Sequence, residues 1–169
     1  MPVDLSKLTY RPCVGIMVLN SEGLVWLGRR SDAKAKLGDA GAWWQMPQGG
    51  IDLGESPSDA ARRELYEETR IRSIDILAEH PDWLDYDLPS ELIGKKWGGR
   101  YRGQTQKWFA VRFTGDDSEI DITPPDHEIE FDAWRWANVD EIMDLIVPFK
   151  AQVYTRVLEA FRPLAKRKR

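Results

Sequence analysis

Three glutamates, Glu64, Glu67 and Glu68, have the spacing that places side chains on one face of an α-helix. Such carboxylates repel one another, at a cost of roughly a few tenths of a kcal/mol per pair on an isolated helix. The cluster therefore favours a compensating cation, and ligands that are all oxygen favour Mg²⁺ or Mn²⁺ over Zn²⁺. Arg62 and Arg63 could neutralise the same carboxylates, and the triplet alone favours that ordinary surface helix.

The residues before the glutamates indicate a loop that leads into a helix. Four of them favour a loop: Pro47, Gly49, Gly50 and Gly54. Pro57 suits the first turn of a helix, and good helix formers follow from Ser58 to Thr69. We therefore expect the loop to end near Glu55 or Ser56.

The spacing across this segment resembles the Nudix box, the signature of hydrolases that act on a nucleoside diphosphate linked to another group. Five residues separate Gly49 from Glu55, and seven more precede Arg63, Glu64 and Leu65. Glu67, Glu68 and Ile71 complete the match, which fails only at Arg70, where the family pattern has glycine. Glycine would ease a left-handed exit from the helix. We expect Arg70→Gly to change stability modestly and to leave the metal requirement intact.

The likeness extends beyond the box, to segments that span about Tyr10 to Leu164. They are YRPCVGIMVLN from Tyr10, WWQMPQGGID from Trp43, YRGQTQKWF from Tyr101, EFDAWRW from Glu130 and VPFK from Val147. Together they resemble a Nudix subgroup of RNA 5′-pyrophosphohydrolases and dinucleoside polyphosphate hydrolases. The resemblance implies removal of pyrophosphate from 5′-triphosphorylated RNA, with hydrolysis of a dinucleoside polyphosphate, such as diadenosine tetraphosphate, as the alternative. A nucleotide- or RNA-binding module without turnover is a third hypothesis, but such modules usually lose box carboxylates.

The resemblance also implies the chemistry of the box. Glu64, Glu67 and Glu68 match its metal ligands, and Glu130 matches a further carboxylate from outside it. Divalent ions, Mg²⁺ first and Mn²⁺ or Zn²⁺ as alternatives, would neutralise the polyphosphate and orient a water for attack. A carboxylate that does not bind metal could act as the general base, and we favour Glu68 or Glu130.

Other positions are expected to support the box or bind the substrate. Glu55 and Arg63 match fixed positions, as Gly49 and Gly50 do, and we interpret the first two as a structural ion pair. Candidate phosphate partners are Arg11, Arg30, Lys107 and Lys150, whereas Gln104 and Phe149 could bond to and stack on a base. In the resembling enzymes, a nucleotide pocket is formed by the positions of Arg11, Gln104, Val147, Phe149 and Lys150. Without the resemblance, these cations would be ordinary surface charges and Phe149 a core residue.

Hydrophobic periodicity predicts the elements that must position these residues. Strands are expected at Cys13–Leu19, Leu24–Arg30, Ile74–His80, Gln106–Thr114 and Phe131–Ala137. Helices are expected at Asp140–Ile146 and Phe149–Leu164, separated near Pro148. The first two strands would form a hairpin, and Ser31 to Ala42 a loop. Asp82 to Gly103 is too irregular for one element, and we expect a functional flap there.

This order of elements predicts an α/β fold, an α/β/α sandwich with a mixed sheet, as the Nudix resemblance also implies. The 169 residues are 42% hydrophobic, enough for one domain with a short arm at 1–9 and a basic tail at 165–169. A net charge of −4 argues against a general nucleic-acid coating protein. The one cysteine, Cys13, is expected to be a buried thiol, and no membrane span or secretory signal is evident. We therefore expect a cytoplasmic protein.

Overall fold

A computed structural model describes residues 8–31, 44–88, 100–146 and 150–165. The strands are β1 (Thr9–Leu19), β2 (Val25–Arg30), β3 (Trp44–Gln45), β4 (Gln48–Gly50), β5 (Ile74–Glu79), β6 (Leu84–Asp87), β7 (Tyr101–Phe113) and β8 (Phe131–Ala137). The α-helices are α2 (Pro57–Thr69), α3 (Ile142–Leu145) and α4 (Ala151–Phe161). Short 3₁₀ turns lie at Asp117–Glu119, Val139–Glu141 and Arg162–Ala165.

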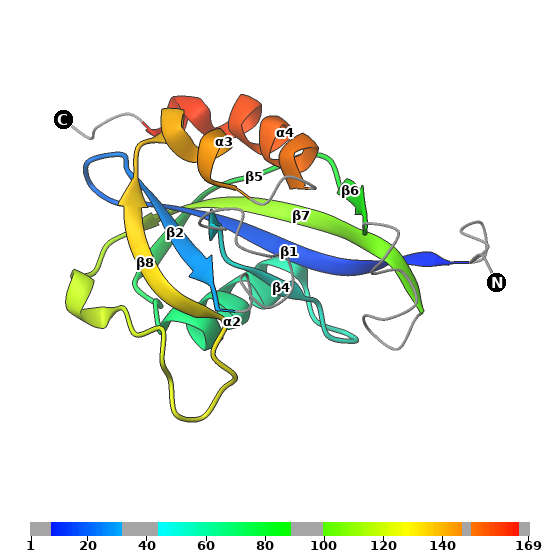
Figure 1. The fold of residues 1–169 in the computed structure, drawn as a ribbon, viewed down its shortest axis with the longest axis horizontal. Coiled ribbons are helices and arrows are strands. Elements are labelled where there is room, and N and C mark those ends of the chain that lie inside the picture. The colour runs from blue at the N-terminus through cyan, green and yellow to red at the C-terminus, as the bar shows by residue number, and fades with distance from the viewer. Residues whose placement is uncertain (1–7, 32–43, 89–99, 147–149, 166–169) are drawn as a thin grey trace.

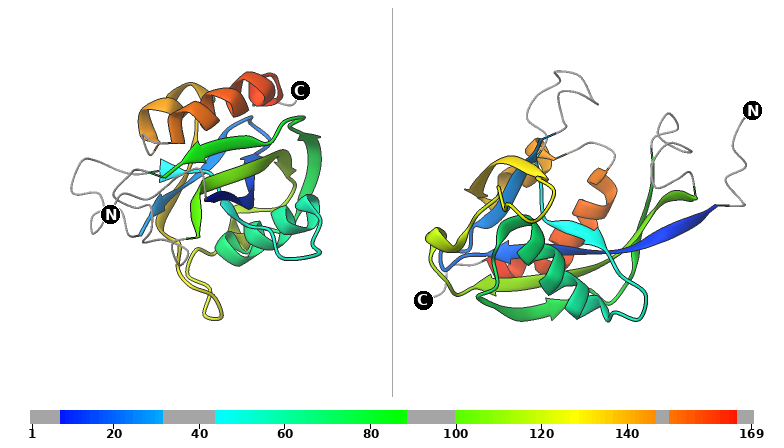
Figure 2. Two further views of the ribbon diagram at one scale, coloured as in Figure 1. Left: turned by 90° about the vertical axis from the view of Figure 1, so that its right-hand side faces the viewer. Right: turned by 90° about the horizontal axis from the view of Figure 1, so that it is seen from below.

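The strands form one mixed sheet in the order β3-β2-β1-β7-β5, to which β4, β6 and β8 add by pairing with β1, β7 and β2. β1 and β7 run parallel through its centre, while the other pairs are antiparallel. Helices α3 and α4 cover one face of the sheet and α2 covers the other (Figures 1 and 2). The α/β/α sandwich predicted from the sequence is therefore confirmed.

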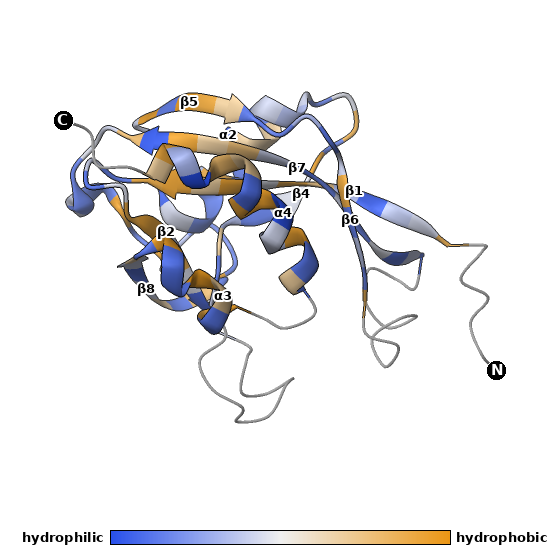
Figure 3. Cartoon of the chain, turned by 90° about the horizontal axis from the view of Figure 1, so that it is seen from above, coloured by the Kyte–Doolittle hydropathy of each residue, from blue (hydrophilic) through white to orange (hydrophobic). Residues whose placement is uncertain are grey.

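Alternating side chains of the central strands build a core on each face. Met17 and Trp108 belong to the cluster that contains Tyr154 of α4, whereas Ile16 and Phe109 belong to the cluster that contains Leu65 of α2. Successive residues of a strand point to opposite faces, so the parts of the central strands that are covered on both sides must be apolar on both faces. The hydropathy colouring shows hydrophobic central strands beneath α3 and α4 (Figure 3).

Helix α2 has the boundaries that the sequence predicts. Ser56 is its N-cap, accepting a hydrogen bond from the Asp59 N–H at 3.2 Å, and Pro57 begins the first turn. Leu65 is fully buried against the sheet. The helix ends at Thr69, and Arg70 then adopts a left-handed conformation with φ 63°, its N–H donating to the Tyr66 carbonyl at 2.8 Å. The left-handed residue that ends the helix is therefore an arginine, at a position where glycine would adopt this conformation more easily.

The other predicted strands are also present, with changed boundaries. Phe131–Ala137 agrees with β8, while β1 begins at Thr9, inside the expected arm, and β7 begins at Tyr101. The predicted hairpin is reduced to one residue pair, Leu19 with Val25. The same edge of β2 pairs with β3 at Gly28 and Arg29, and its other edge pairs with β8. The first of the two predicted C-terminal helices is a 3₁₀ turn followed by the single turn of α3.

Two predictions of irregular structure need correction. Gln48–Gly50 was expected in a loop but forms β4, because it pairs with β1 and places Gly50 opposite Cys13. Within the expected flap, Leu84–Asp87 forms β6 and lies antiparallel to the start of β7. Residues 89–99 of that segment and 32–42 of the predicted loop lie outside the described residues. None of the described helices is long and apolar enough to cross a membrane.

Candidate active site

A pocket of about 330 Å³ opens beside the box helix. It is lined by Arg11, Arg30, Gln45, Gln48, Gly49, Gly50, Glu64, Glu68, Tyr86, Leu88, Gln104, Glu128, Glu130 and Lys150. The acidic side chains come from α2 and from the segment before β8, whereas the cationic ones come from β1, from β2 and from the residue before α4. Carboxylates and cations therefore share one polar cavity.

Glu68 has a buried carboxylate that is only partly satisfied. The side chain accepts a hydrogen bond from the Gln48 backbone, but its Oε2 atom is buried and has no hydrogen-bond partner among the described residues. Burial, and then the charges of Glu130 and Glu64, raise the pKa of Glu68 well above its usual value. A buried anionic oxygen without a donor is costly. A cation in the pocket would offset that cost.

Arg63 forms hydrogen bonds with several groups beside the pocket. Its guanidinium donates to both Glu55 oxygens, at 2.8 and 2.9 Å, and to Glu64 Oε1 at 2.9 Å. A further bond of 2.8 Å reaches the Gly50 carbonyl. The hydrogen bond from Arg63 lowers the pKa of Glu55 to about 2. The structure thus shows the predicted Glu55–Arg63 pair, in which the arginine orients carboxylates and does not line the pocket.

Glu64 receives opposing influences from its surroundings. Burial raises its pKa to about 7, while the charge of Arg63 and its hydrogen bond act in the opposite direction. The contact with Arg63 uses Oε1. Glu64 therefore remains a carboxylate of the pocket whose negative charge is incompletely compensated by the protein.

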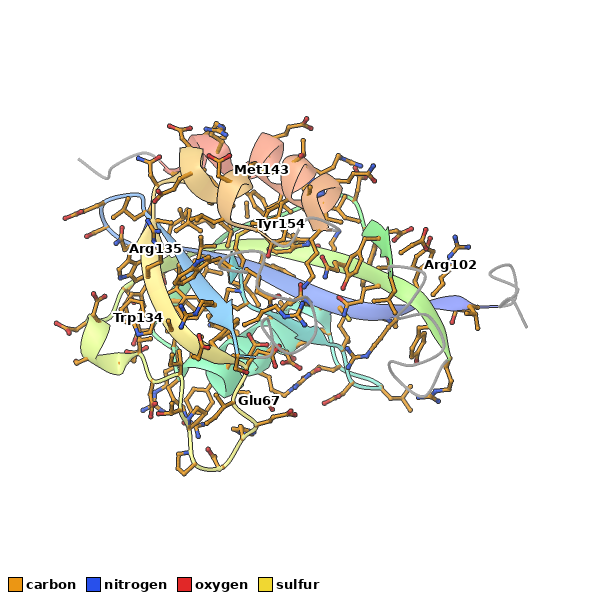
Figure 4. The ribbon with its side chains drawn as sticks, viewed as in Figure 1. Glu67, Arg102, Trp134, Arg135, Met143 and Tyr154 are labelled. Carbon is orange, nitrogen blue, oxygen red and sulfur yellow. The ribbon has the colours of Figure 1, made fainter. Side chains whose placement is uncertain are left out.

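Glu67 is placed differently from Glu64 and Glu68. Its oxygens lie 3.2 and 3.4 Å from the Arg63 guanidinium, and it is absent from the residues that line the pocket. Figure 4 shows Glu67 on the side of the molecule away from α3 and α4. The structure thus brings together Glu64, Glu68 and Glu130, while Glu67 lies beside them on Arg63.

The carboxylates of the pocket fit a divalent cation in their chemistry. No three His, Cys, Asp or Glu side chains in the described ranges have the geometry of a formed metal site. However, among the described residues Glu68 Oε2 has no hydrogen-bond partner, and burial raises the pKa of Glu64. The protein alone therefore leaves the ionised form of these carboxyls incompletely compensated, and a bound cation would favour that form. Oxygen donors of this kind suit Mg²⁺ or Mn²⁺.

The two glycines of β4 are required by close approach. A Cβ atom on Gly49 would lie 2.1 Å from Cδ of Glu64, and one on Gly50 would lie 2.4 Å from Nη2 of Arg11. Both distances are shorter than any van der Waals contact. Gly49 and Gly50 therefore let the strand run directly beneath one acidic and one basic side chain of the pocket.

The cationic side of the pocket is held in place by amide side chains. Lys150 donates to Gln45 Oε1 and Gln48 Oε1, both at 3.0 Å, and is almost fully buried. Gln104 is also buried and accepts a hydrogen bond of 2.7 Å from Gln106. Arg11, Arg30, Gln104 and Lys150 all line the pocket.

The remaining predicted substrate residues are not brought to the pocket by the described structure. Lys107 does not line it, and its ammonium lies 3.5 Å from a carboxylate oxygen of Glu79. Since Gln104 lines the pocket from β7, Lys107 at odd spacing points to the opposite face of that strand. Val147 and Phe149 lie outside the described residues.

Several pocket residues were missed by the sequence reasoning: Gln45, Gln48, Tyr86, Leu88 and Glu128. Gln45 and Gln48 lie in the segment WWQMPQGGID, whose resemblance could have identified them. Glu128 stands two residues before Glu130, the spacing of neighbours on one side of an extended chain. Tyr86 and Leu88 could not be identified from the sequence, because the segment containing β6 was expected to be irregular.

An α/β/α sandwich with a carboxylate-bearing helix beside a cationic pocket defines a class of hydrolases that act on phosphoanhydride bonds. The family model described as the NUDIX domain matches residues 9–157. The chain belongs to the Nudix family and is a Nudix hydrolase. Members of this family generally need a divalent metal ion.

Similar proteins agree with this assignment. An RNA pyrophosphohydrolase of Mesorhizobium japonicum is 57% identical over 167 residues, covering 97% of this chain and 96% of that protein. One of Brucella anthropi is 57% identical over 166 residues, covering 96% and 95%.

Solved structures show the same fold at low sequence identity. The dihydroneopterin triphosphate pyrophosphohydrolase of E. coli has a TM-score of 0.66 at 19% identity, covering 90% of this chain and 99% of that one. The C. elegans Ap4A hydrolase, as a binary complex, has a TM-score of 0.61 at 17% identity, covering 90% and 98%.

Proposed function

We propose that this Nudix hydrolase removes pyrophosphate from the 5′-triphosphate end of RNA and leaves a 5′-monophosphate. One structural observation carries the proposal: Glu64, Glu68 and Glu130 share a pocket with Arg11, Arg30 and Lys150. A triphosphate needs cationic donors for its oxygens, and its hydrolysis needs carboxylates for metal and proton transfer. The relatives named RNA pyrophosphohydrolase, 57% identical over nearly the whole chain, support RNA as the substrate.

Glu64, Glu68 and Glu130 would hold the divalent metal, with Glu67 as a further ligand candidate on the same helix. We propose Mg²⁺ as the ion, with Mn²⁺ or Zn²⁺ as alternatives. When bound, the metal would neutralise phosphate oxygens and make a water molecule more nucleophilic. Arg63 keeps Glu64 in place through its 2.9 Å hydrogen bond.

The protein's own side chains would bind the substrate and move the proton. Arg11, Arg30 and Lys150 would contact phosphate oxygens, and the two amide partners of Lys150 fix its ammonium in the pocket. Whichever of Glu68 and Glu130 does not bind the metal would accept the proton of the attacking water and so act as the general base. Gln104, with Val147 and Phe149 by resemblance, would contact a base near the RNA 5′ end.

The test compares a short 5′-triphosphate RNA with diadenosine tetraphosphate in the presence of Mg²⁺, following the release of pyrophosphate and of mononucleotides. We expect faster turnover of the RNA. Preference for the dinucleotide would instead make the protein a dinucleoside polyphosphate hydrolase. No release from either substrate would leave a nucleotide- or RNA-binding module.

Two lysines provide a matched pair of variants for this assay. Lys150→Met should lower kcat/KM on the RNA at least about tenfold, because it removes a charge-assisted contact to phosphate. Lys107→Met should leave it nearly unchanged, because Lys107 is paired with Glu79 outside the pocket. Equal losses in the two variants would contradict the assignment of the pocket as the substrate site.

We also propose that the chain acts as one domain in the cytoplasm. Triphosphorylated RNA ends arise where transcription takes place. Cys13 also fits this location, because its thiol is fully buried. Burial raises the pKa of the thiol to about 11, which keeps it protonated and unreactive.

A further inference from the structure

Arg70 lies at the junction of α2 with a segment that carries Glu128 and Glu130. Its guanidinium carbon lies 4.8 Å from the centre of the Tyr66 ring, and its Nη2 forms an ion pair with Asp126 Oδ1. The Arg70 side chain is mostly buried, with 16% of its surface exposed. Arginine therefore holds an unfavourable left-handed backbone conformation while its side chain contacts a separate part of the chain.

Asp126 belongs to the segment of residues 121–130, which we call the 121–130 loop. The backbone N–H of Asp121 donates to the Thr69 carbonyl at 2.8 Å, which attaches the start of the loop to the end of α2. At its other end, the Ser31 N–H donates to the Glu130 carbonyl at 3.1 Å. The Arg70–Asp126 pair holds the middle of the loop. Figures 1 and 2 show this loop extending beyond the sheet beside α2 and leading into β8.

The loop must keep its carboxylates close to those of α2. Glu128 and Glu130 line the same pocket as Glu64 and Glu68, so like charges from two elements face one another. Their repulsion in a partly buried pocket favours movement of the loop away from α2. A pair of opposite charges between Arg70 and Asp126 acts against that movement, at the end of the same helix.

We propose that Arg70 is a positioning residue for the metal site, because it ties the 121–130 loop to α2 and so keeps Glu130 opposite Glu68. The inference rests on the proposed role of these carboxylates. The guanidinium contacts neither substrate nor metal in this role. Its effect is to preorganise ligands that come from two elements, which raises the affinity for the cation.

The test measures Mn²⁺ binding without substrate, by electron spin resonance of the free ion, together with thermal unfolding. Arg70→Gly removes the guanidinium. Glycine also adopts the left-handed backbone conformation more easily than arginine, so the melting temperature should be unchanged or higher. The Kd for Mn²⁺ should rise about tenfold, the lower end of the loss when groups that orient metal ligands are removed. Asp126→Asn should give a similar rise.

The double variant Arg70→Gly/Asp126→Asn should bind Mn²⁺ as weakly as either single variant, because the two changes break one interaction. Arg72→Ala is the matched control, since Arg72 also lies over the Tyr66 ring, at 5.9 Å, and should retain the parental Kd. Parental Mn²⁺ affinity in Arg70→Gly or in Asp126→Asn, or additive losses in the double variant, would overturn the proposal. If Arg70→Gly fails to fold, the Kd of Asp126→Asn for Mn²⁺ alone tests the proposal.

Turnover assays separate this inference from the proposed function. In Arg70→Gly, kcat on the triphosphate RNA should fall at low Mg²⁺ and recover as Mg²⁺ is raised, which a general loss of folded protein would not produce. If the parental protein shows no RNA hydrolysis, the proposed function fails, whereas the comparison of Mn²⁺ affinities still tests Arg70.

Discussion

Glu68 has a buried carboxyl group in the pocket. No residue in the described ranges donates a hydrogen bond to its Oε2 atom, and Glu130 and Glu64 add negative charge close to it. Such a site costs free energy in the metal-free protein, because a carboxylate loses its hydration without full compensation. Active sites commonly retain arrangements of this kind at the expense of stability.

Glu68→Gln should therefore separate stability from activity. The amide keeps an oxygen for the Gln48 N–H and removes the charge, so the metal-free variant should be more stable by about 1 kcal/mol. Turnover of the triphosphate RNA should fall at least about 100-fold, because a ligand or base is lost. Thermal unfolding in EDTA and initial rates in Mg²⁺ measure the two effects. Glu159→Gln, on the exposed face of α4, is the control and should change neither.

At the scale of elements, β4 and the loop that follows it contain glycines with different tasks. Gly49 is constrained by Glu64, whose Cδ would lie 2.1 Å from an added Cβ. No atom of the described part of the chain lies within 4 Å of a Cβ added to Gly54, but its φ of 80° is left-handed. Gly49 is therefore required by the close approach of Glu64, and Gly54 is required by its left-handed backbone conformation.

Alanine at these two positions should produce opposite results. Gly49→Ala should push the end of the flexible Glu64 side chain away from Arg63, lowering turnover on the order of 100-fold with little loss of stability. Gly54→Ala should cost about 1 kcal/mol of unfolding free energy, through its left-handed backbone, and retain activity. Rates and urea unfolding of both variants check this expectation. Loss of activity in Gly54→Ala without loss of stability would contradict it.

These elements also show what sequence patterns can and cannot predict. Helix α2 was predictable because Ser56, Pro57 and the helix formers after them all act locally. Strand β4 was not, because two consecutive glycines favour a loop, and their pairing with β1 depends on a distant strand. Glycine is required in this strand because the side chains of Arg11 and Glu64 occupy the space that Cβ atoms would need.

The candidate site was predicted in the same uneven way. The spacing of Glu64 and Glu68 on one helix sets their common direction, and the structure brings both to the pocket. Lys107 was chosen for its charge, but alternation along β7 places it opposite to Gln104. Glu130 could be placed beside Glu68 only by resemblance, since no local pattern shows which loop crosses the end of a helix.

At the scale of the whole molecule, the sheet brings distant segments to one pocket. The parallel pair β1 and β7 places Arg11 directly opposite Gln104, and β4 pairs with β1 on its other side. Helix α2 and the 121–130 loop then supply carboxylates from the face opposite α3 and α4, while Lys150 precedes α4 itself. The pocket is therefore shared by both layers of helices, and a ligand there contacts parts of the chain that are far apart in sequence.

A divalent cation should consequently stabilise the whole fold. Binding to the native state alone stabilises it by RT ln(1 + [L]/Kd), about 2.7 kcal/mol when Mg²⁺ is present at 100 times its Kd. For a domain of this size, such a change raises the melting temperature by about 5 to 10 °C. Thermal unfolding in EDTA and in increasing Mg²⁺ measures the shift. It should be largely lost in Glu68→Gln, since that variant lacks an anionic ligand, and retained in Glu159→Gln. An equal shift in all three proteins would mean that Mg²⁺ binds elsewhere, and the carboxylates of the pocket would then lose their assignment as the metal site.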